Sequence, residues 1–256
     1  MFGLFRSKSE REVLVDPPDL GEGRRVYAVG DVHGRLDLLR QIIDKIADDD
    51  LARGQVEKTE LIMLGDFVDR GPDSAGVLDF MMRLGEWWPD VTCLLGNHEE
   101  VFLMAARGDE SALRFMTRIG GRETLLSYGA TESDLDSMTL GELRDWLMAA
   151  VPEAHLQFIE SMKEKVLIGN YAFVHAGIRP QIRMDDQEAR DLRWIREEFL
   201  TCEEPHDYFV IHGHSITAGV EERVNRIGID TGAYASGVLT AVGLEGTERW
   251  FLGTTP

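Results

Sequence analysis

The sequence predicts an α/β fold in one compact domain, in which a mostly parallel sheet is joined by a second sheet and a helical insertion. Three observations predict it. Short apolar runs end abruptly in glycine-containing turns, stretches with helical periodicity separate the first runs, and glycine-separated strands close the chain. A chain of 256 residues, 43% of them hydrophobic, is long enough to bury one sizeable core.

Five apolar runs have the length of a buried strand, and each is followed by a turn that carries Asp, Asn or His. The runs and their turns are Val26–Val29 before Gly30-Asp31, Leu61–Leu64 before Gly65-Asp66, Val91–Leu95 before Gly96-Asn97-His98, Ala172–Val174 before His175, and Phe209–Ile211 before His212-Gly213-His214.

The predicted helices lie between the first three runs. Apolar residues recur at helical spacing in Leu36–Ile46 and in Ser74–Leu84, which gives each stretch one apolar face. Strands that alternate with helices indicate a parallel sheet buried on both faces, and ligands gather at the carboxyl ends of such strands. We therefore expect the polar residues that follow the five runs to converge on one edge.

Three segments fall outside this alternation. Residues 99–165 are rich in Met, Glu and Arg and carry helical periodicity, which predicts a helical insertion over the site. Residues 223–252 hold short strands between glycines, which favours a second sheet built from hairpins. Residues 1–24 are polar and contain Pro17-Pro18, so we interpret them as an N-terminal tail ahead of a single domain at 25–256.

The charge balance narrows the range of partners. Lys and Arg number 27 against 46 Asp and Glu, which gives a formal net charge of −19 and a pI of about 4.7. A protein that binds DNA usually presents a basic face, so no DNA partner is expected. A site for a phosphate-bearing substrate must therefore supply its own positive charge, from metal ions or a few arginines.

Two further features predict a cytoplasmic location. Cys93 and Cys202 lie far apart in sequence and form neither a disulfide framework nor a CxxC metal site, which is typical of reduced cysteines. The first residues lack the apolar core and cleavage site of a signal peptide, and no stretch approaches the roughly 20 apolar residues of a membrane span. The sequence carries no signal for oligomeric state.

Six side chains of metal-ligand type follow the five runs: Asp31, His33, Asp66, Asn97, His175 and His214. Carboxylate, carboxamide and imidazole donors together suit Mn²⁺, Fe²⁺ or Zn²⁺ better than Ca²⁺, which prefers oxygen alone. Each residue also has a structural alternative, since Asp31 or Asp66 could cap a helix and Asn97 could form a turn. Their joint occurrence at five strand ends favours the metal site.

Several sequence blocks resemble the serine/threonine phosphoprotein phosphatase family of the metallophosphoesterase superfamily. They are Gly30-Asp31-Val32-His33-Gly34, Gly65-Asp66-Phe67-Val68-Asp69-Arg70-Gly71, Gly96-Asn97-His98-Glu99 and His175-Ala176-Gly177. Two later blocks, Gly213-His214-Ser215 and Ile229-Asp230-Thr231-Gly232-Ala233, resemble the bacterial branch, which includes enzymes like diadenosine tetraphosphatase. The resemblance implies a metallophosphoesterase-type αββα sandwich, with two mixed sheets flanked by helices.

The resemblance further implies two divalent metal ions, with Mn²⁺ preferred and Fe, Zn or Ni as alternatives. The first ion would be held by Asp31, His33 and Asp66. The second would be held by Asp66, Asn97, His175 and His214, so that Asp66 bridges the pair. A hydroxide between the ions would attack phosphorus.

Roles for the residues beside the metals are implied in the same way. His98 would protonate the leaving group, oriented by Asp69, and Arg70 would clamp the phosphate oxygens. A second arginine is expected from the segment Trp194-Ile195-Arg196-Glu197-Glu198, in which Arg196 fits best. Arg193, one turn earlier, is the competitor.

The remaining histidines are interpreted as structural. His155 is expected in a helix and His206 in an exposed loop. His212 lies two residues before the expected ligand His214, and we interpret it as a structural neighbour of the metal ligands.

The main functional prediction is a metal-dependent phosphomonoesterase, namely a serine/threonine protein phosphatase or one of dual specificity. The alternative is an enzyme of the same chemistry whose substrate is a phosphorylated nucleotide, such as a dinucleoside polyphosphate or a capped RNA end. A third hypothesis, a non-catalytic metal-binding scaffold, predicts a damaged site, whereas every expected ligand, the Asp69–His98 pair and Arg70 are present.

Overall fold

A computed structural model describes residues 17–88 and 90–255, in which strands form two mixed sheets. The first sheet has the strand order β10 (Glu248–Gly253), β9 (Thr240–Glu245), β1 (Arg24–Val29), β2 (Lys58–Met63) and β3 (Val91–Cys93). β1, β2 and β3 run parallel, whereas β9 is antiparallel to β1 and forms a hairpin with β10.

The second sheet has the order β4 (Lys165–Ile168), β5 (Tyr171–Val174), β6 (Phe209–His212), β8 (Arg226–Gly228) and β7 (Glu221–Glu222). β5, β6 and β8 are parallel, and an antiparallel strand lies at each edge. The five apolar runs are therefore divided between two sheets. The sequence had suggested that all five end at one edge of a single sheet, and this expectation is wrong.

The prediction that residues 223–252 form a second sheet of hairpins is wrong. Of the segment 223–252, β8 pairs with β6 in the second sheet, while the β9–β10 hairpin extends the first sheet. The physical reason lies at β1. β2 satisfies the backbone groups on one side of β1, and buried backbone groups on its other side also need partners, which β9 supplies.

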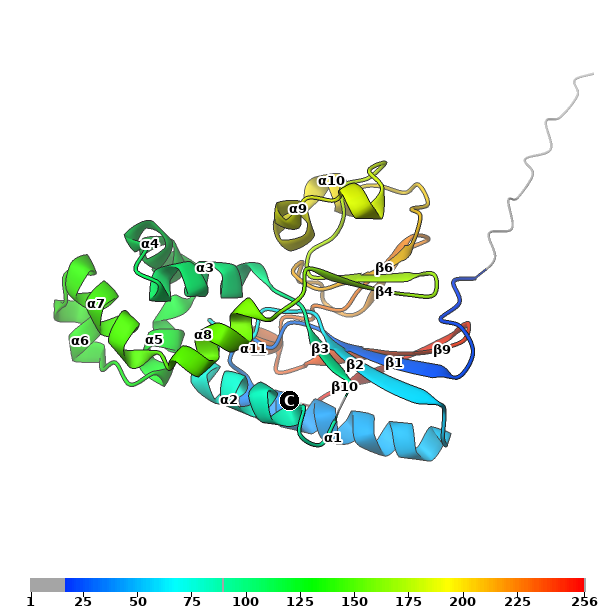
Figure 1. Ribbon diagram of the computed structural model, residues 1–256, viewed down its shortest axis with the longest axis horizontal. Helices are drawn as coiled ribbons and strands as arrows, with labels where there is room; N and C mark the ends of the chain where they lie inside the picture. Colours follow the sequence, from blue (N-terminus) through cyan, green and yellow to red (C-terminus); the bar gives the residue numbers. More distant parts are fainter. Residues whose placement is uncertain (1–16, 89, 256) are drawn as a thin grey trace, which may run out of the picture.

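The molecule has four layers (Figure 1). Helices α1 (Leu36–Arg53) and α2 (Ser74–Leu84) cover the outer face of the first sheet, and α9 (Ala189–Trp194) and α10 (Glu197–Leu200) cover that of the second. A separate apolar core fills the space between the sheets. This arrangement confirms the predicted αββα sandwich of two mixed sheets flanked by helices.

The alternation of side chains along β1 explains why its apolar run is continuous. Tyr27 and Val29 pack in the core beneath the helices, whereas Val26 and Ala28 pack in the core between the sheets. Because successive side chains of a strand point to opposite faces, a strand that is covered on both faces must be apolar throughout.

The segment predicted as a helical insertion consists of helices that project beyond the sheets (Figure 1). They are α3 (Asn97–Ala106), α4 (Glu110–Ile119), α5 (Gly121–Ser127), α6 (Glu132–Ser137), α7 (Leu140–Ala150) and α8 (Glu153–Glu160). α6 and α7 begin at capping boxes, in which Thr131 and Thr139 each exchange hydrogen bonds with the acidic residue three positions later.

Part of the segment predicted as a tail is packed. The Leu20 side chain is buried in the core between the sheets, and its N–H donates to Gly246 O at 2.9 Å. Asn170 N donates to Asp19 O at 2.8 Å, so this segment contacts both sheets. The rest of the predicted tail, residues 1–16, lies outside the described residues. None of the described helices has the length and apolarity that a membrane crossing requires.

Candidate metal centre

The six predicted metal ligands lie together where the two sheets meet. Each follows the carboxyl end of a strand, and all of them are buried. β1, β2 and β3 of the first sheet lead to Asp31, His33, Asp66 and Asn97. β5 and β6 of the second sheet lead to His175 and His214.

Backbone strain is concentrated at this centre. Of the described residues, six that are not glycine have a positive φ, and five of these are predicted site residues: His33, Asp66, Asp69, Arg70 and His214, with φ between 45° and 70°. A left-handed conformation costs an L-residue roughly 1–2 kcal/mol and persists where the surroundings enforce it. Strain of this kind is typical of functional sites.

Close approach of two loops explains the glycines that flank the first two sequence blocks. Gly34 has a φ of +63°, and a Cβ atom there would lie 2.6 Å from Gly71 O. The same loops are joined by hydrogen bonds from Val32 N and His33 N to Asp66 O, at 3.0 and 2.8 Å. Side chains larger than hydrogen would separate the loops and move the ligands that they carry.

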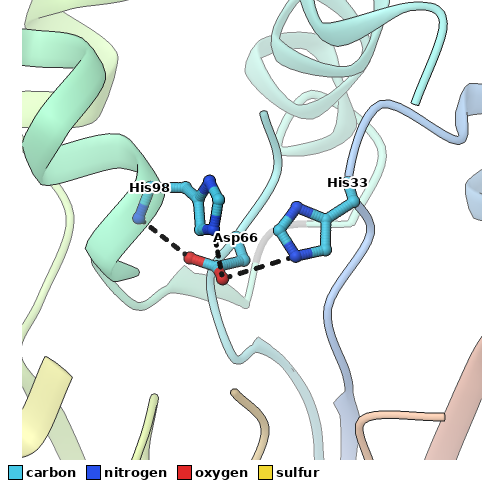
Figure 2. Close-up of side chains that lie close together, drawn as sticks. All are labelled: His33, Asp66 and His98. Carbon is cyan, nitrogen blue, oxygen red and sulfur yellow. Dashed lines mark hydrogen bonds and ion pairs between the residues drawn. The ribbon is translucent and has the colours of Figure 1, made fainter. Parts of the chain in front are cut away.

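The first group of possible ligands contains His33, Asp66 and His98 (Figure 2). His33 Nε2 lies 3.5 Å from Asp66 Oδ2 and has no other partner among the described residues. Its Nδ1 lies 2.8 Å from Val68 O, which fixes Nδ1 as the protonated nitrogen. Burial lowers the pKa of His33 to about 3, so the ring is neutral and its Nε2 lone pair is available to a metal.

The second group contains Asp66, His175 and His214. His175 Nε2 lies 3.4 Å from Asp66 Oδ1 and 3.0 Å from Asn97 Oδ1, while its Nδ1 donates to Leu64 O at 2.8 Å. Burial lowers the pKa of His214 to about 2, and its Nε2 has no partner among the described residues. Asp66 thus offers one carboxylate oxygen to each group, as a bridging ligand would.

Asp31 lies beside these groups and is held by the backbone. Its carboxylate accepts from His214 N at 3.0 and 3.1 Å. Burial raises the pKa of Asp31 well above its usual range, and the negative charges of Asp230 and Asp66 raise it further.

Asp230 belongs to the centre and was given no role in the sequence analysis. Its side chain is 1% exposed, its Oδ1 accepts from Gly232 N at 2.9 Å, and its Oδ2 has no partner among the described residues. Burial raises the pKa of Asp230 to about 6. The signal was available, because Asp230 follows β8 (Arg226–Gly228) and the apolar Ile229 as the predicted ligands follow their strands.

Buried carboxylates and unpartnered imidazole nitrogens together fit divalent cations. Asp31, Asp66 and Asp230 raise one another's energy when ionised, and a cation relieves that repulsion. The Nε2 atoms of His33 and His214 supply neutral nitrogen donors to the same space.

His98 and Asp69 form the expected pair. His98 Nδ1 lies 2.7 Å from Asp69 Oδ2, and Asp69 Oδ1 accepts from Thr124 Oγ1 at 2.7 Å. Burial acts to lower the pKa of His98, but Asp66 and Asp69 outweigh it, and the net effect raises the pKa. A raised pKa favours the protonated ring, which is the form that a general acid requires.

The carboxylate of Glu99 organises the loop behind Asp66. Its two oxygens accept from the backbone N–H groups of Asp66, Phe67, Val68 and Gly96, at 2.7 to 3.1 Å. Burial raises the pKa of Glu99, whereas its N–H partners favour the ionised form. The sequence analysis quoted Glu99 within a block without assigning it this role.

The two candidates for the second arginine have different surroundings. The Arg193 guanidinium pairs with Glu100 at 2.9 Å and also with Glu164, so both of its terminal nitrogens are occupied. Arg196 is exposed and contacts the centre through Nη2, which lies 3.4 Å from His214 O. It also lines a cavity of about 480 Å³. The structure therefore favours Arg196 over Arg193 as the arginine that is open to a ligand.

The remaining histidines are separate from both ligand groups. His212 is buried, and its ring packs at right angles to Phe199, 5.1 Å between centroids. His155 bonds to the Tyr128 hydroxyl at 2.7 Å and to Asp79 at 3.0 Å, which ties the helical insertion to α2.

Comparisons with known proteins assign this chain to one family. The model of the family described as calcineurin-like phosphoesterase matches residues 24–235. Two curated relatives are symmetrical bis(5'-nucleosyl)-tetraphosphatases. The one from Nitrosospira multiformis is 30% identical over 185 residues, which is 72% of this chain and 54% of the relative. The one from Dechloromonas aromatica is 31% identical over 179 residues, or 70% and 51%. The chain spans about half the length of these relatives.

Solved structures show the same fold. A candidate diadenosine tetraphosphatase matches with a TM-score of 0.60 and 22% identity over 90% of this chain and 93% of that one. A protein serine/threonine phosphatase from Saccharomyces cerevisiae matches with a TM-score of 0.55 and 16% identity over 90% of this chain and 79% of that one. At these identities the likeness concerns the fold alone.

Proposed function

The chain belongs to the calcineurin-like phosphoesterase family, and on this premise we propose that it hydrolyses a phosphorus–oxygen bond of a dinucleoside polyphosphate. The observation that carries the proposal is the centre in which Asp66 offers one oxygen to each of two ligand groups. The choice of substrate is supported by the curated relatives, which are bis(5'-nucleosyl)-tetraphosphatases. It replaces the protein phosphatase that the sequence blocks had placed first.

We assign the metal ligands as predicted from the sequence. Asp31, His33 and Asp66 would hold one divalent ion, and Asp66, Asn97, His175 and His214 the other, with Mn²⁺ as the first choice of metal. When bound, such ions supply Lewis acidity toward phosphoryl oxygens and lower the pKa of a water molecule. The hydrogen bonds of His33 Nδ1 and His175 Nδ1 to backbone carbonyls orient both rings for this role.

His98 is proposed as the proton donor to the leaving oxygen. Its Nε2 lies 3.9 Å from Asp66 Oδ2, so the ring faces the centre, and its Nδ1 is fixed by Asp69. Arg70 Nη2 lies 3.1 Å from the same Nε2. When a phosphoryl oxygen takes that arginine donor, Nε2 becomes free to carry the proton that it delivers.

Two arginines are proposed to bind the phosphate chain. Arg70 and Arg196 each present a planar fork of donors that matches phosphate oxygens. Their charges and those of the metal ions would act at the centre itself, whereas exposed acidic residues are screened by salt beyond roughly 8–10 Å. A chain with a net charge of −19 can bind an anionic substrate in this way.

A phosphorylated protein is the second candidate substrate. The sequence blocks that resemble serine/threonine phosphoprotein phosphatases favour it, and the same residues would serve a phosphoserine or phosphothreonine ester. The two proposals differ in the leaving group and share the reaction centre.

One comparison tests the proposed function. The manganese-loaded protein is assayed for kcat/KM on diadenosine tetraphosphate and on a panel of phosphopeptides, with Asp66→Asn as the control for contaminating activity. We expect diadenosine tetraphosphate to be preferred by more than about tenfold. A preference for phosphopeptides would replace the proposed substrate by the second candidate. Absence of turnover with every divalent metal would refute an enzymatic function.

A further inference from the structure

Tyr234 lies at the metal centre although no sequence block assigned it a role. It belongs to the short helix α11 (Ala233–Ser236), which follows Asp230. The guanidinium carbon of Arg70 lies over the Tyr234 ring, 5.0 Å from its centroid. The ring of His33 meets the same ring edge-on, with centroids 5.6 Å apart and planes at 85°. Tyr234 thus contacts the proposed phosphate-binding arginine and a proposed metal ligand.

The backbone around Tyr234 is anchored on both sides. Gly232 and Gly237 adopt left-handed conformations, with φ of 66° and 74°, and begin and end the turn of helix. Gly232 N donates to Asp230 Oδ1 at 2.9 Å, and Arg35 Nη1 donates to Ala233 O at 3.0 Å. These contacts hold the ring in place beside Arg70.

Arg70 has no carboxylate partner in the described part of the chain, where no Asp or Glu oxygen lies within 4.0 Å of its guanidinium nitrogens. Its polar contacts are His98 Nε2 at 3.1 Å and a long one to Ile119 O at 3.4 Å. By contrast, Arg193 is held by two glutamates. Arg70 is therefore positioned without its charge being neutralised.

The face of an aromatic ring suits this task. The ring attracts a cation through its quadrupole, and the N–H groups in the guanidinium plane stay free for other acceptors. A carboxylate in the same place would bind those N–H groups and compete with a phosphate for them. A ring can therefore fix the position of an arginine that must still bind an anion.

We propose that Tyr234 is a positioning residue for phosphate binding, whose ring holds the Arg70 guanidinium with its donors directed at the centre around Asp66. This inference rests on the proposed function, in which Arg70 binds the phosphate chain. The contact with Arg70 is made by the Tyr234 ring and not by its hydroxyl, because the hydroxyl has no hydrogen bond within residues 17–88 and 90–255.

Three variants separate the ring from the hydroxyl and from simple packing. Tyr234→Phe keeps the ring, Tyr234→Leu keeps apolar bulk without a π face, and Tyr208→Leu is a matched control at the far end of β6. The readout is the dissociation constant of inorganic phosphate from the manganese-loaded protein, measured by calorimetry, which does not require turnover. Metal content and thermal unfolding are measured for every variant, and Tyr234→Met replaces the leucine variant if that protein does not fold.

We expect Tyr234→Leu to weaken phosphate binding about 2- to 30-fold, the range of a cation–π contact. Tyr234→Phe should stay within about twofold of the wild type, because the ring remains. Tyr208→Leu should have no effect. Equal losses in the phenylalanine and leucine variants, or no loss in the leucine variant, would overturn the proposal.

A double-mutant cycle tests whether Tyr234 acts through Arg70. In an Arg70→Ala background, Tyr234→Leu should cause no further loss of phosphate affinity. An undiminished second loss would show that Tyr234 acts independently and would overturn the positioning role. A wild-type protein that binds phosphate but does not cleave diadenosine tetraphosphate would contradict the proposed function and leave this inference intact. A manganese-loaded protein that does not bind phosphate would contradict the inference.

Discussion

Replacement of His98 by Asn tests whether this side chain donates a proton to the leaving group. The side-chain amide introduced by His98→Asn would occupy the place of Cγ and Nδ1 of the imidazole, so it can still donate to Asp69, 2.7 Å away in the native protein. The Nε2 atom that faces the centre is lost, together with the proton that it is proposed to deliver. The variant therefore removes the acid and keeps its hydrogen-bonded neighbour.

The size of the effect depends on the leaving group. An alkoxide that leaves from phosphoserine resembles hydroxide, whose conjugate acid has a pKa of about 16, and it needs a proton. For such a substrate the loss should be about 10²–10⁴ in kcat, or roughly 3–5 kcal/mol in the barrier. A nucleotide leaves through a phosphate oxygen with a pKa of about 6, so the loss on diadenosine tetraphosphate should be less than about tenfold.

The assay compares kcat for both substrates in the native protein and in the His98→Asn variant, with His206→Asn as a control. His206 bonds to Asn225 and lies outside both ligand groups. Similar losses on the two substrates would refute the proton-donor role and indicate that His98 acts through the geometry of the centre.

Three further predictions follow from the contacts of single residues. Arg196→Ala should raise the KM for diadenosine tetraphosphate about tenfold. Arg193→Ala should leave KM unchanged and lower the midpoint of thermal unfolding, because Arg193 is bound by two glutamates. The reverse pattern would exchange the roles of the two arginines. Glu99→Gln should lower the free energy of unfolding in urea by about 2–6 kcal/mol, since an amide nitrogen would face two of the four N–H groups that Glu99 accepts; an unchanged value would show that the native Glu99 is protonated. Burial lowers the pKa of His212 to about 4, below the value of about 6.5 in an unfolded chain, so its contribution to stability is present above pH 6.5 and is lost as the pH falls toward 4. Between pH 7 and pH 4, the free energy of unfolding measured in urea should therefore fall by about 3 kcal/mol less in His212→Asn than in the native protein. Equal falls in the two proteins would contradict this reasoning.

The centre was predictable where its signals are local in sequence. An apolar run followed by glycine and a ligand-type side chain specifies a strand end within a few residues, and Asp31, Asp66 and His175 were found in this way. The boundaries of α2, which begins at Ser74 and ends at Leu84, follow from local periodicity in the same manner.

The remaining features depend on contacts between distant segments. The pairing of β9 with β1 requires the free edge of β1, which no local pattern encodes. The sequence only ranked Arg196 above Arg193, and the structure distinguishes them by the pairing of Arg193 with Glu100 and Glu164 and by the contact of Arg196 with His214 O. Leu20 was assigned to a tail because its neighbours are polar, whereas its own side chain fills a gap between the sheets.

The distribution of the centre over two sheets has a consequence for biosynthesis. The bridging Asp66 and the ligands of the first group lie within residues 31–98, whereas His175 and His214 come from strands made much later. A nascent chain that has emerged only through the helical insertion can present one ligand group and not the other. Because domains assemble as their segments emerge from the ribosome, the second of the two proposed ions would be captured only after the second sheet has docked on the first. Occupancy of the proposed pair would therefore mark a chain whose folding is complete, and an interrupted chain would present only one of the two ligand groups.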